Sequence, residues 1–160
     1  GTLALELLEA VPDLDAVVAP CGGGGLLSGI SVVFAALRAD AAVWGVEPAA
    51  GDDMQRSLAA GEPVEIAQPR TIADSLQTTK PALRTLAHIA ALTRGVVLVS
   101  DDELRAAVAF AFERLKVVVE PGGAAALAAL LAGRVPEVSG KRVGVVLSGG
   151  NLNLPNVLTS

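Results

Sequence analysis

The stretch DAVVAPCGGGGLLSGI, at residues 15–30, decides the fold more than any other part of the chain. Residues 15–19 are a short run rich in valine and alanine, which predicts a buried β-strand. Four consecutive glycines follow at 22–25, and the amphipathic segment 26–38 then predicts an α-helix. The apolar face of that helix is expected to consist of Leu26, Ile30, Phe34 and Leu37. A strand that leads through a tight turn into a helix is typical of α/β proteins.

The same alternation of strands and helices extends along the rest of the chain. Further helices are predicted at 2–10, 52–60, 82–92 and 122–132. Another helix should follow a capping box at Ser100 and Glu103, with an apolar stripe at Leu104, Val108, Phe112 and Leu115. Further strands are predicted at 43–46, 96–99 and 142–147. Because most strands are apolar throughout, we expect a single α/β domain over 1–160, with a mostly parallel sheet covered by helices on both faces.

Composition excludes several classes of protein. Apolar residues make up 52% of the 160 residues and the formal charge is -5 without a basic cluster, which argues against a nucleic-acid surface. No apolar run approaches the roughly 18 residues of a membrane span. Cys21 is the only cysteine, so no internal disulfide can form and a cytoplasmic location is expected. His88, the single histidine, has no obvious acidic partner, which argues against a Ser-His-Asp triad.

The glycines at 22–25 are the first candidate site. Glycine lets backbone amides approach a ligand closely, and the following helix begins with unpaired amides and a positive dipole end. Together these features favour binding of a phosphate or another anion over a merely tight turn. The spacing does not match the dinucleotide-binding fingerprint.

Two further candidates lie near the ends of predicted elements. Residues 148–151, Ser-Gly-Gly-Asn, follow the last strand, where ligands gather in open α/β sheets, although the same residues are common in turns. Glu120 precedes a helix start and is either a site residue or a solvated cap.

An acidic cluster follows the second predicted strand. Glu47 with Asp52 and Asp53 could hold a hard cation such as Mg²⁺ or Ca²⁺. The alternative is that Asp52 or Asp53 caps the next helix. Spacing alone favours the cap.

These motifs, in this order, resemble the fold-type-II enzymes that depend on pyridoxal phosphate (PLP), in the branch of the serine/threonine dehydratases and serine racemases. The resemblance spans nearly the whole chain. It rests on the glycine loop followed by Leu26, and on four later signatures: Val46-Glu47-Pro48, Thr71-Ile72-Ala73-Asp74, Val119-Glu120-Pro121 and Leu147-Ser148-Gly149-Gly150-Asn151.

The resemblance implies a role for each matching residue. Amides of Gly22, Gly23, Gly24, Gly25 and Leu26 would hold the cofactor phosphate. Ser148, next to Gly149, would hydrogen-bond the pyridine nitrogen, and Glu120 would lie near the cofactor. In metal-dependent relatives the cation site would consist of Glu47, the carbonyl of Gly51, and Asp53. The chain departs from the usual pattern at Ser75, where glycine is common, and at Gly122 and Gly123.

The resemblance also implies that a large part of the enzyme is missing. The family's Schiff-base lysine and its Ser-Gly-Asn-His substrate loop would precede Gly1. Lys80, Lys116 and Lys141 are the only lysines, none lies in such a motif, and surface positions are expected for them. We therefore expect the chain to be a fragment without the N-terminal half, and to be inactive alone.

The function implied by the resemblance is dehydration of L-threonine or L-serine to a 2-oxo acid and ammonia. Serine racemase and 3-hydroxyaspartate dehydratase are the alternatives on the same scaffold. A non-catalytic module that binds phosphate or PLP and pairs with another chain is the alternative of a different class. The expected partners are a small amino-acid substrate and either a second copy in a dimer or the missing half.

Overall fold

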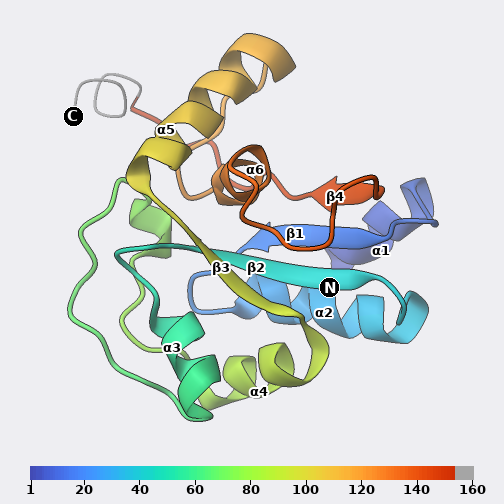
Figure 1. The fold of residues 1–160 in the computed structure, drawn as a ribbon, viewed down its shortest axis with the longest axis horizontal. Helices are drawn as coiled ribbons and strands as arrows, with labels where there is room; N and C mark the ends of the chain where they lie inside the picture. The colour runs from blue at the N-terminus through green and yellow to red at the C-terminus, as the bar shows by residue number, and fades with distance from the viewer. Residues whose placement is uncertain (154–160) are drawn as a thin grey trace.

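The computed structural model describes residues 1–153, which form an α/β fold (Figure 1). Its strands are β1 (Ala16–Pro20), β2 (Ala42–Pro48), β3 (Gly95–Val99) and β4 (Val143–Val145). Its α-helices are α1 (Thr2–Ala10), α2 (Gly25–Leu37), α3 (Asp53–Ala60), α4 (Leu83–Leu92), α5 (Asp101–Phe110) and α6 (Ala125–Leu131). A 3-10 turn (Asp74–Leu76) interrupts the long connection between α3 and α4. The predicted strands and helices are thus confirmed, with small shifts at their ends.

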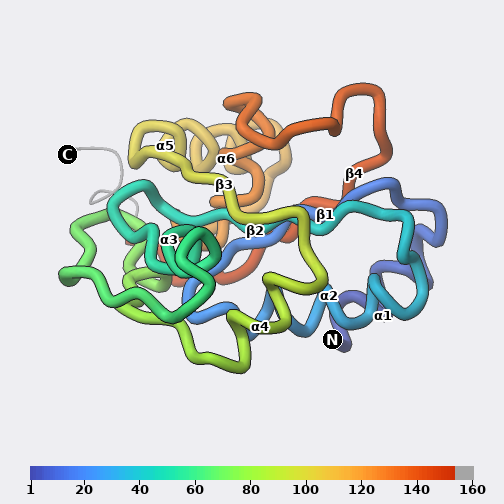
Figure 2. Tube along the Cα trace, turned by 60° about the horizontal axis from the view of Figure 1, so that its bottom comes forward, coloured from blue at the N-terminus to red at the C-terminus, as the bar shows by residue number. Residues whose placement is uncertain are grey.

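The four strands form one parallel sheet in the order β3-β2-β1-β4. Helices α1, α2, α3 and α4 lie on one face of the sheet, and α5 and α6 lie on the other (Figures 1 and 2). The predicted fold class is therefore confirmed. Because all strands point the same way, the loops after β1, β2 and β4 reach one edge of the sheet.

Each face of the sheet has its own core because side chains alternate along a strand. Val17 and Ala19 of β1 pack with the helices below the sheet, whereas Val18 packs with α5 and α6. The alanines of α6 from 124 to 129 are fully buried, and their small side chains let this helix lie directly on β1, β2 and β3. The close packing expected for this Ala-rich helix is confirmed.

The predicted apolar stripe of α2 is wrong at its two ends. Leu26 and Leu37 are exposed, and the buried stripe is formed by Leu27, Ile30 and Phe34. Residues at spacings of three and four share one side of a helix, so the stripe that faces β1 and β2 begins one residue later than predicted. Leu26 is thereby left at the rim of a cavity described below.

The stripe of α5 is also wrong beyond Val108. Leu104 and Val108 are buried as predicted, but Phe112 and Leu115 are exposed. A π-helical turn, Ala111–Leu115, follows α5 and adds one residue to the turn. The extra residue changes the phase of the helix, so that Ala111 takes the buried position.

The start of α5 agrees with its sequence signal. Ser100 Oγ accepts a hydrogen bond from the Glu103 amide at 3.2 Å, and the Glu103 carboxylate accepts from the Ser100 amide at 2.7 Å. The predicted capping box is confirmed. Among residues 1–153, no helix has both the length and the apolar character needed to cross a bilayer.

Candidate active site

One cavity of about 270 Å³ lies at the edge of the sheet where β1 and β4 end. All eight residues predicted to bind the cofactor line this cavity: Gly22, Gly23, Gly24, Gly25, Leu26, Glu120, Ser148 and Gly149. They come from three segments that are far apart in the sequence. The structure adds Pro20, Ser75, Leu76 and Gly122 to the lining.

The glycine loop forms the floor of this cavity at the start of α2. Gly24 is required by the chain's own structure, since its φ is +83° and a side chain would approach Ile89 and Met54 to 2.8 Å. Gly25 is different, because a Cβ there would meet no atom within 4 Å. The first amides of α2 have no intrahelical acceptor. An open floor of unpaired amides at a helix N-terminus is a cradle for a phosphate.

The two later signatures form the opposite wall and hold each other in place. The Ser148 amide donates to the Gly123 carbonyl at 3.3 Å, and the Asn151 amide donates to the Glu120 carboxylate at 3.0 Å. A Cβ at Gly123 would lie 1.5 Å from the Ser148 carbonyl oxygen. This close approach explains physically why the chain has glycine at 123.

Gly149 completes this contact because its φ is +77° and a side chain would collide with the Glu120 carboxylate. Glu120 therefore positions the loop that carries Ser148. This part of the structure agrees with neither of the two sequence interpretations in full: Glu120 lines the cavity, and its carboxylate is engaged by the protein's own backbone.

The segment after Thr71 supplies a wall that sequence reasoning did not assign to the cavity. Thr71 Oγ1 donates to the Asp101 carboxylate at 2.5 Å, and the Ile72 amide donates to the same carboxylate at 3.2 Å. Asp101 is the first residue of α5, so this segment is fixed to the opposite face of the sheet. The following turn places Ser75 and Leu76 beside the glycine loop.

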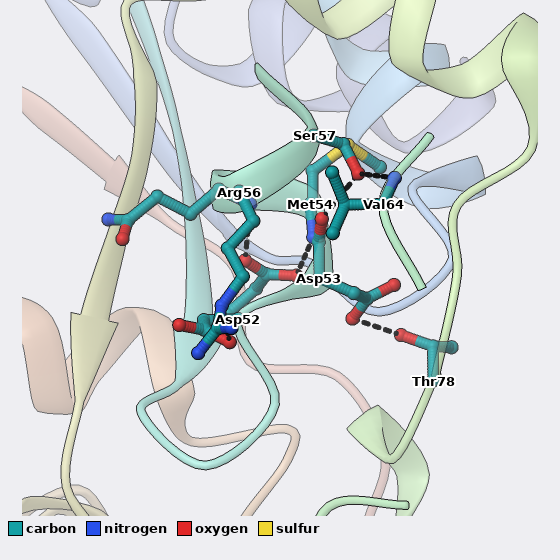
Figure 3. A network of polar contacts seen from close by, with 9 residues as sticks. Asp52, Asp53, Met54, Arg56, Ser57, Val64 and Thr78 are labelled. Carbon is teal, nitrogen blue, oxygen red and sulfur yellow. Dashed lines mark hydrogen bonds and ion pairs between the residues drawn. The ribbon is translucent and has the colours of Figure 1, made fainter. Parts of the chain in front are cut away.

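The acidic cluster lies elsewhere, under the N-terminus of α3 (Figure 3). Both oxygens of the buried Glu47 carboxylate accept amide hydrogen bonds, from Met54 and Gln55, each at 2.9 Å. The prediction that Asp52 or Asp53 caps this helix is wrong. Asp52 makes no capping bond and pairs instead with Arg56 at 2.8 Å.

Burial changes the acidity of this cluster. Desolvation raises the pKa of Glu47 from 4.5 to about 8, although the two amide hydrogen bonds act in the opposite direction. Burial likewise raises the pKa of Asp53 above 3.8, against the hydrogen bond that its Oδ1 accepts from Thr78 at 3.0 Å. The chain therefore holds two carboxyl groups close together away from water.

The predicted cation ligands are only partly brought together. Asp53 Oδ2 is buried without a hydrogen-bond partner in the described structure, and each Glu47 oxygen retains a second lone pair. These features fit a cation between Glu47 and Asp53. Within residues 1–153, however, no three His, Cys, Asp or Glu side chains converge as a metal-binding group.

The remaining reactive residues have structural or surface positions. Cys21 is buried, and desolvation followed by the charges of Glu47 and Asp53 raises the pKa of its thiol. His88 lies on α4, with Nδ1 2.7 Å from the carbonyl of Arg84. The lysines at 80, 116 and 141 are exposed, as predicted.

Comparison with known proteins agrees with the geometry of the cavity. Residues 1–149 match the family described as pyridoxal-phosphate dependent enzyme. The chain is 41% identical to serine racemase of Dictyostelium discoideum, over 98% of this chain and 49% of that protein. It is 44% identical to L-threo-3-hydroxyaspartate ammonia-lyase of Saccharomyces cerevisiae, over 99% of this chain and 48% of the relative.

Among solved structures, a threonine deaminase of T.th. superposes with a TM-score of 0.88 at 41% identity, over 95% of this chain and 52% of that chain. The chain thus spans about half the length of the relatives it matches.

Proposed function

Because the chain belongs to the pyridoxal-phosphate dependent enzyme family, we propose that it is the carboxy-terminal half of an ammonia-lyase that acts on L-threonine or L-serine. The products would be a 2-oxo acid and ammonia. The observation that carries the proposal is the single cavity that combines an open glycine cradle with the Ser148 hydroxyl. The similarity to a threonine deaminase and a hydroxyaspartate ammonia-lyase supports it.

The residues of this chain would bind and orient the cofactor. Amides at 22–26 would bind its phosphate, and Ser148 would hydrogen-bond its pyridine nitrogen. When bound, the cofactor supplies an electron sink for bond breaking at the substrate α-carbon. A neutral serine hydroxyl does not hold that nitrogen protonated as a carboxylate would, which tempers the sink and suits loss of a β-hydroxyl. Glu120 would keep Ser148 in place through the Asn151 amide.

The lysine that carries the cofactor would lie in the amino-terminal half, so the 160 residues alone would be inactive. The exposed apolar side chains at the end of α5, among them Phe112 and Val118, support a covering partner surface. We propose that this partner is the other half of the protein and that the complete enzyme is a cytoplasmic dimer. Measurable turnover by the isolated 160-residue chain would contradict the proposed division of the site.

The alternative activity is racemisation of serine, or dehydration of 3-hydroxyaspartate. It is favoured by similarity of the same size to a serine racemase and to a hydroxyaspartate ammonia-lyase. A purely binding role for the chain would require that no lysine from another segment enters the cavity.

The decisive experiment uses the full-length protein with added PLP. A visible absorption band that borohydride removes would indicate an imine with a lysine of the enzyme. Threonine, serine and 3-hydroxyaspartate are then assayed for 2-oxo acid and ammonia, and the remaining serine is analysed for its D-enantiomer. Absence of both products and of D-serine would refute the enzymatic proposal.

Gly25→Ala provides a matched binding test. The added methyl group meets open space, so the melting temperature of the PLP-free protein should stay unchanged. It would stand in the phosphate cradle, and we expect PLP affinity to fall about tenfold or more. Unchanged affinity would contradict the assignment of the cradle.

We also propose that Mg²⁺ or Ca²⁺ binds between Glu47 and Asp53, with the Gly51 carbonyl as a further ligand. The support is the unpartnered Asp53 Oδ2 and the preference of both cations for oxygen. Calorimetric titration of the protein with each cation, and of Asp53→Asn as the control, tests this site.

A further inference from the structure

We propose that Ser75 and Gly122 act as a pair that places a hydroxyl group on the wall of the cavity, and that Ser75 Oγ contacts the bound cofactor. The inference rests on the proposed function, and deepens it by adding a contact residue and the residue that positions it. Both line the cavity.

The two positions share one space. A Cβ built on Gly122 would lie 2.1 Å from Ser75 Oγ, which is far closer than two unbonded atoms can approach. The same Cβ would lie 3.5 Å from Ser75 Cβ, which is an ordinary contact. The missing side chain at 122 is therefore what allows the Ser75 hydroxyl, rather than the whole residue, to stay where it is.

The Ser75 backbone is held independently of this hydroxyl. Its amide donates to the Asp74 carboxylate at 2.8 Å, and its carbonyl oxygen lies 3.6 Å from the position of a Cβ on Gly22. The preceding segment is bound to Asp101 through Thr71. Rotation of the side chain is thus the main freedom left to Ser75, and Gly122 determines which rotamer is open.

The hydroxyl is free to serve a ligand. Ser75 is exposed, and no hydrogen-bond partner of its Oγ is recorded among residues 1–153. Ser75 lies between the glycine loop, which it contacts at Gly22, and the turn that contains Gly122. A cofactor with its phosphate on the glycine loop and its ring nitrogen at Ser148 would pass this wall, where the hydroxyl can donate a hydrogen bond.

The test is a cycle of three variants of the full-length protein: Ser75→Ala, Gly122→Ala and the double variant. The dissociation constant for PLP is measured by titration of the PLP-free protein, and its melting temperature is measured separately. Loss of one hydrogen bond should weaken PLP binding about 2–10-fold in Ser75→Ala. Gly122→Ala should weaken it equally, because its methyl group displaces the hydroxyl.

The double variant should bind PLP no more weakly than either single variant, since the same hydroxyl is lost in each. In the PLP-free protein, Gly122→Ala should lower the melting temperature by about 2–6 °C when residue 75 is serine, and by less when it is alanine. Wild-type affinity of Ser75→Ala, or losses that multiply in the double variant, would overturn the proposal. Failure of the wild-type protein to bind PLP would instead refute the proposed function.

Discussion

The tripeptide Val-Glu-Pro occurs twice, at 46–48 and at 119–121, and its two glutamates have opposite environments. Glu47 is fully buried at the end of the central strand β2, where its carboxylate accepts the first amides of α3. Glu120 is partly exposed beside the cavity, where its carboxylate accepts one amide of the Ser148 loop. The same local sequence thus holds a helix in the interior in one place and a ligand-facing loop in the other.

This difference shows that burial decides what a carboxylate contributes. Glu47 has replaced all of its water with two protein amides, so the energy of the fold depends on it. Glu120 retains contact with solvent and holds a short loop, so the geometry of the cavity depends on it more than the fold does. Each prediction below measures one side of this contrast.

The largest effect is expected for Glu47→Ala. The change leaves two amides at the start of α3 without acceptors and opens a cavity beside β2. We expect the free energy of unfolding to fall by about 3–5 kcal/mol, and by about 1–3 kcal/mol in Glu47→Gln, which keeps one acceptor oxygen. Urea unfolding of the full-length protein measures both. Equal destabilisation by Glu120→Ala would remove the contrast.

A smaller effect is expected from pH in the cation-free protein. The pKa of Glu47 is raised from 4.5 to about 8, so the unfolded chain releases this proton at a lower pH than the folded chain. Stability is therefore greatest below pH 4.5 with respect to this group, and declines as pH rises toward about 8. The raised pKa of Asp53 acts in the same direction.

The expected decline is about 2–4 kcal/mol, measured as the urea midpoint at a series of pH values. Glu47→Gln should flatten most of it, whereas Glu120→Gln should leave it unchanged. Saturating Mg²⁺ should also flatten it if the cation binds, because a cation favours the ionised carboxylates. A decline that survives in Glu47→Gln would show that another group is responsible.

The smallest effect on stability is expected for Glu120→Ala, within about 1 kcal/mol, since the carboxylate accepts a single recorded amide hydrogen bond. Its effect on PLP affinity should be larger, a loss of about 3–10-fold, because the Asn151 amide and the loop before it are released. Glu113→Ala, at an exposed site on the π-helical turn, serves as the control. A variant that melts early and binds PLP normally would reverse the assignment.

Much of the fold was predictable because it depends on local signals. The apolar runs at 15–19 and 96–99 became strands, and the capping box at Ser100 became the start of α5. The errors occurred where phase matters. Leu26 and Phe112 follow helical periodicity in the sequence, but the start of α2 and the π-helical turn shift the buried side by one residue.

The candidate site was predictable as a set of residues but not as an arrangement. Sequence signatures identified eight residues that line one cavity. They did not indicate that Glu47 caps α3, that Asp101 fixes the segment after Thr71, or that Ser75 faces Gly122. Each of these contacts joins residues that are more than a single helical turn apart in sequence, where periodicity and capping rules carry no information.

The sequence by itself determined the alternation of strands and helices, the parallel sheet and the family, because these depend on residue type and short spacings. Only the tertiary structure decided which glutamate is buried, which glycines are required by neighbouring atoms and which leave open space. These properties depend on distances between segments that the chain brings together only when it folds. At Gly25 and Gly123 the same residue type therefore has two meanings: one glycine leaves room for a ligand, and the other lets two backbones touch.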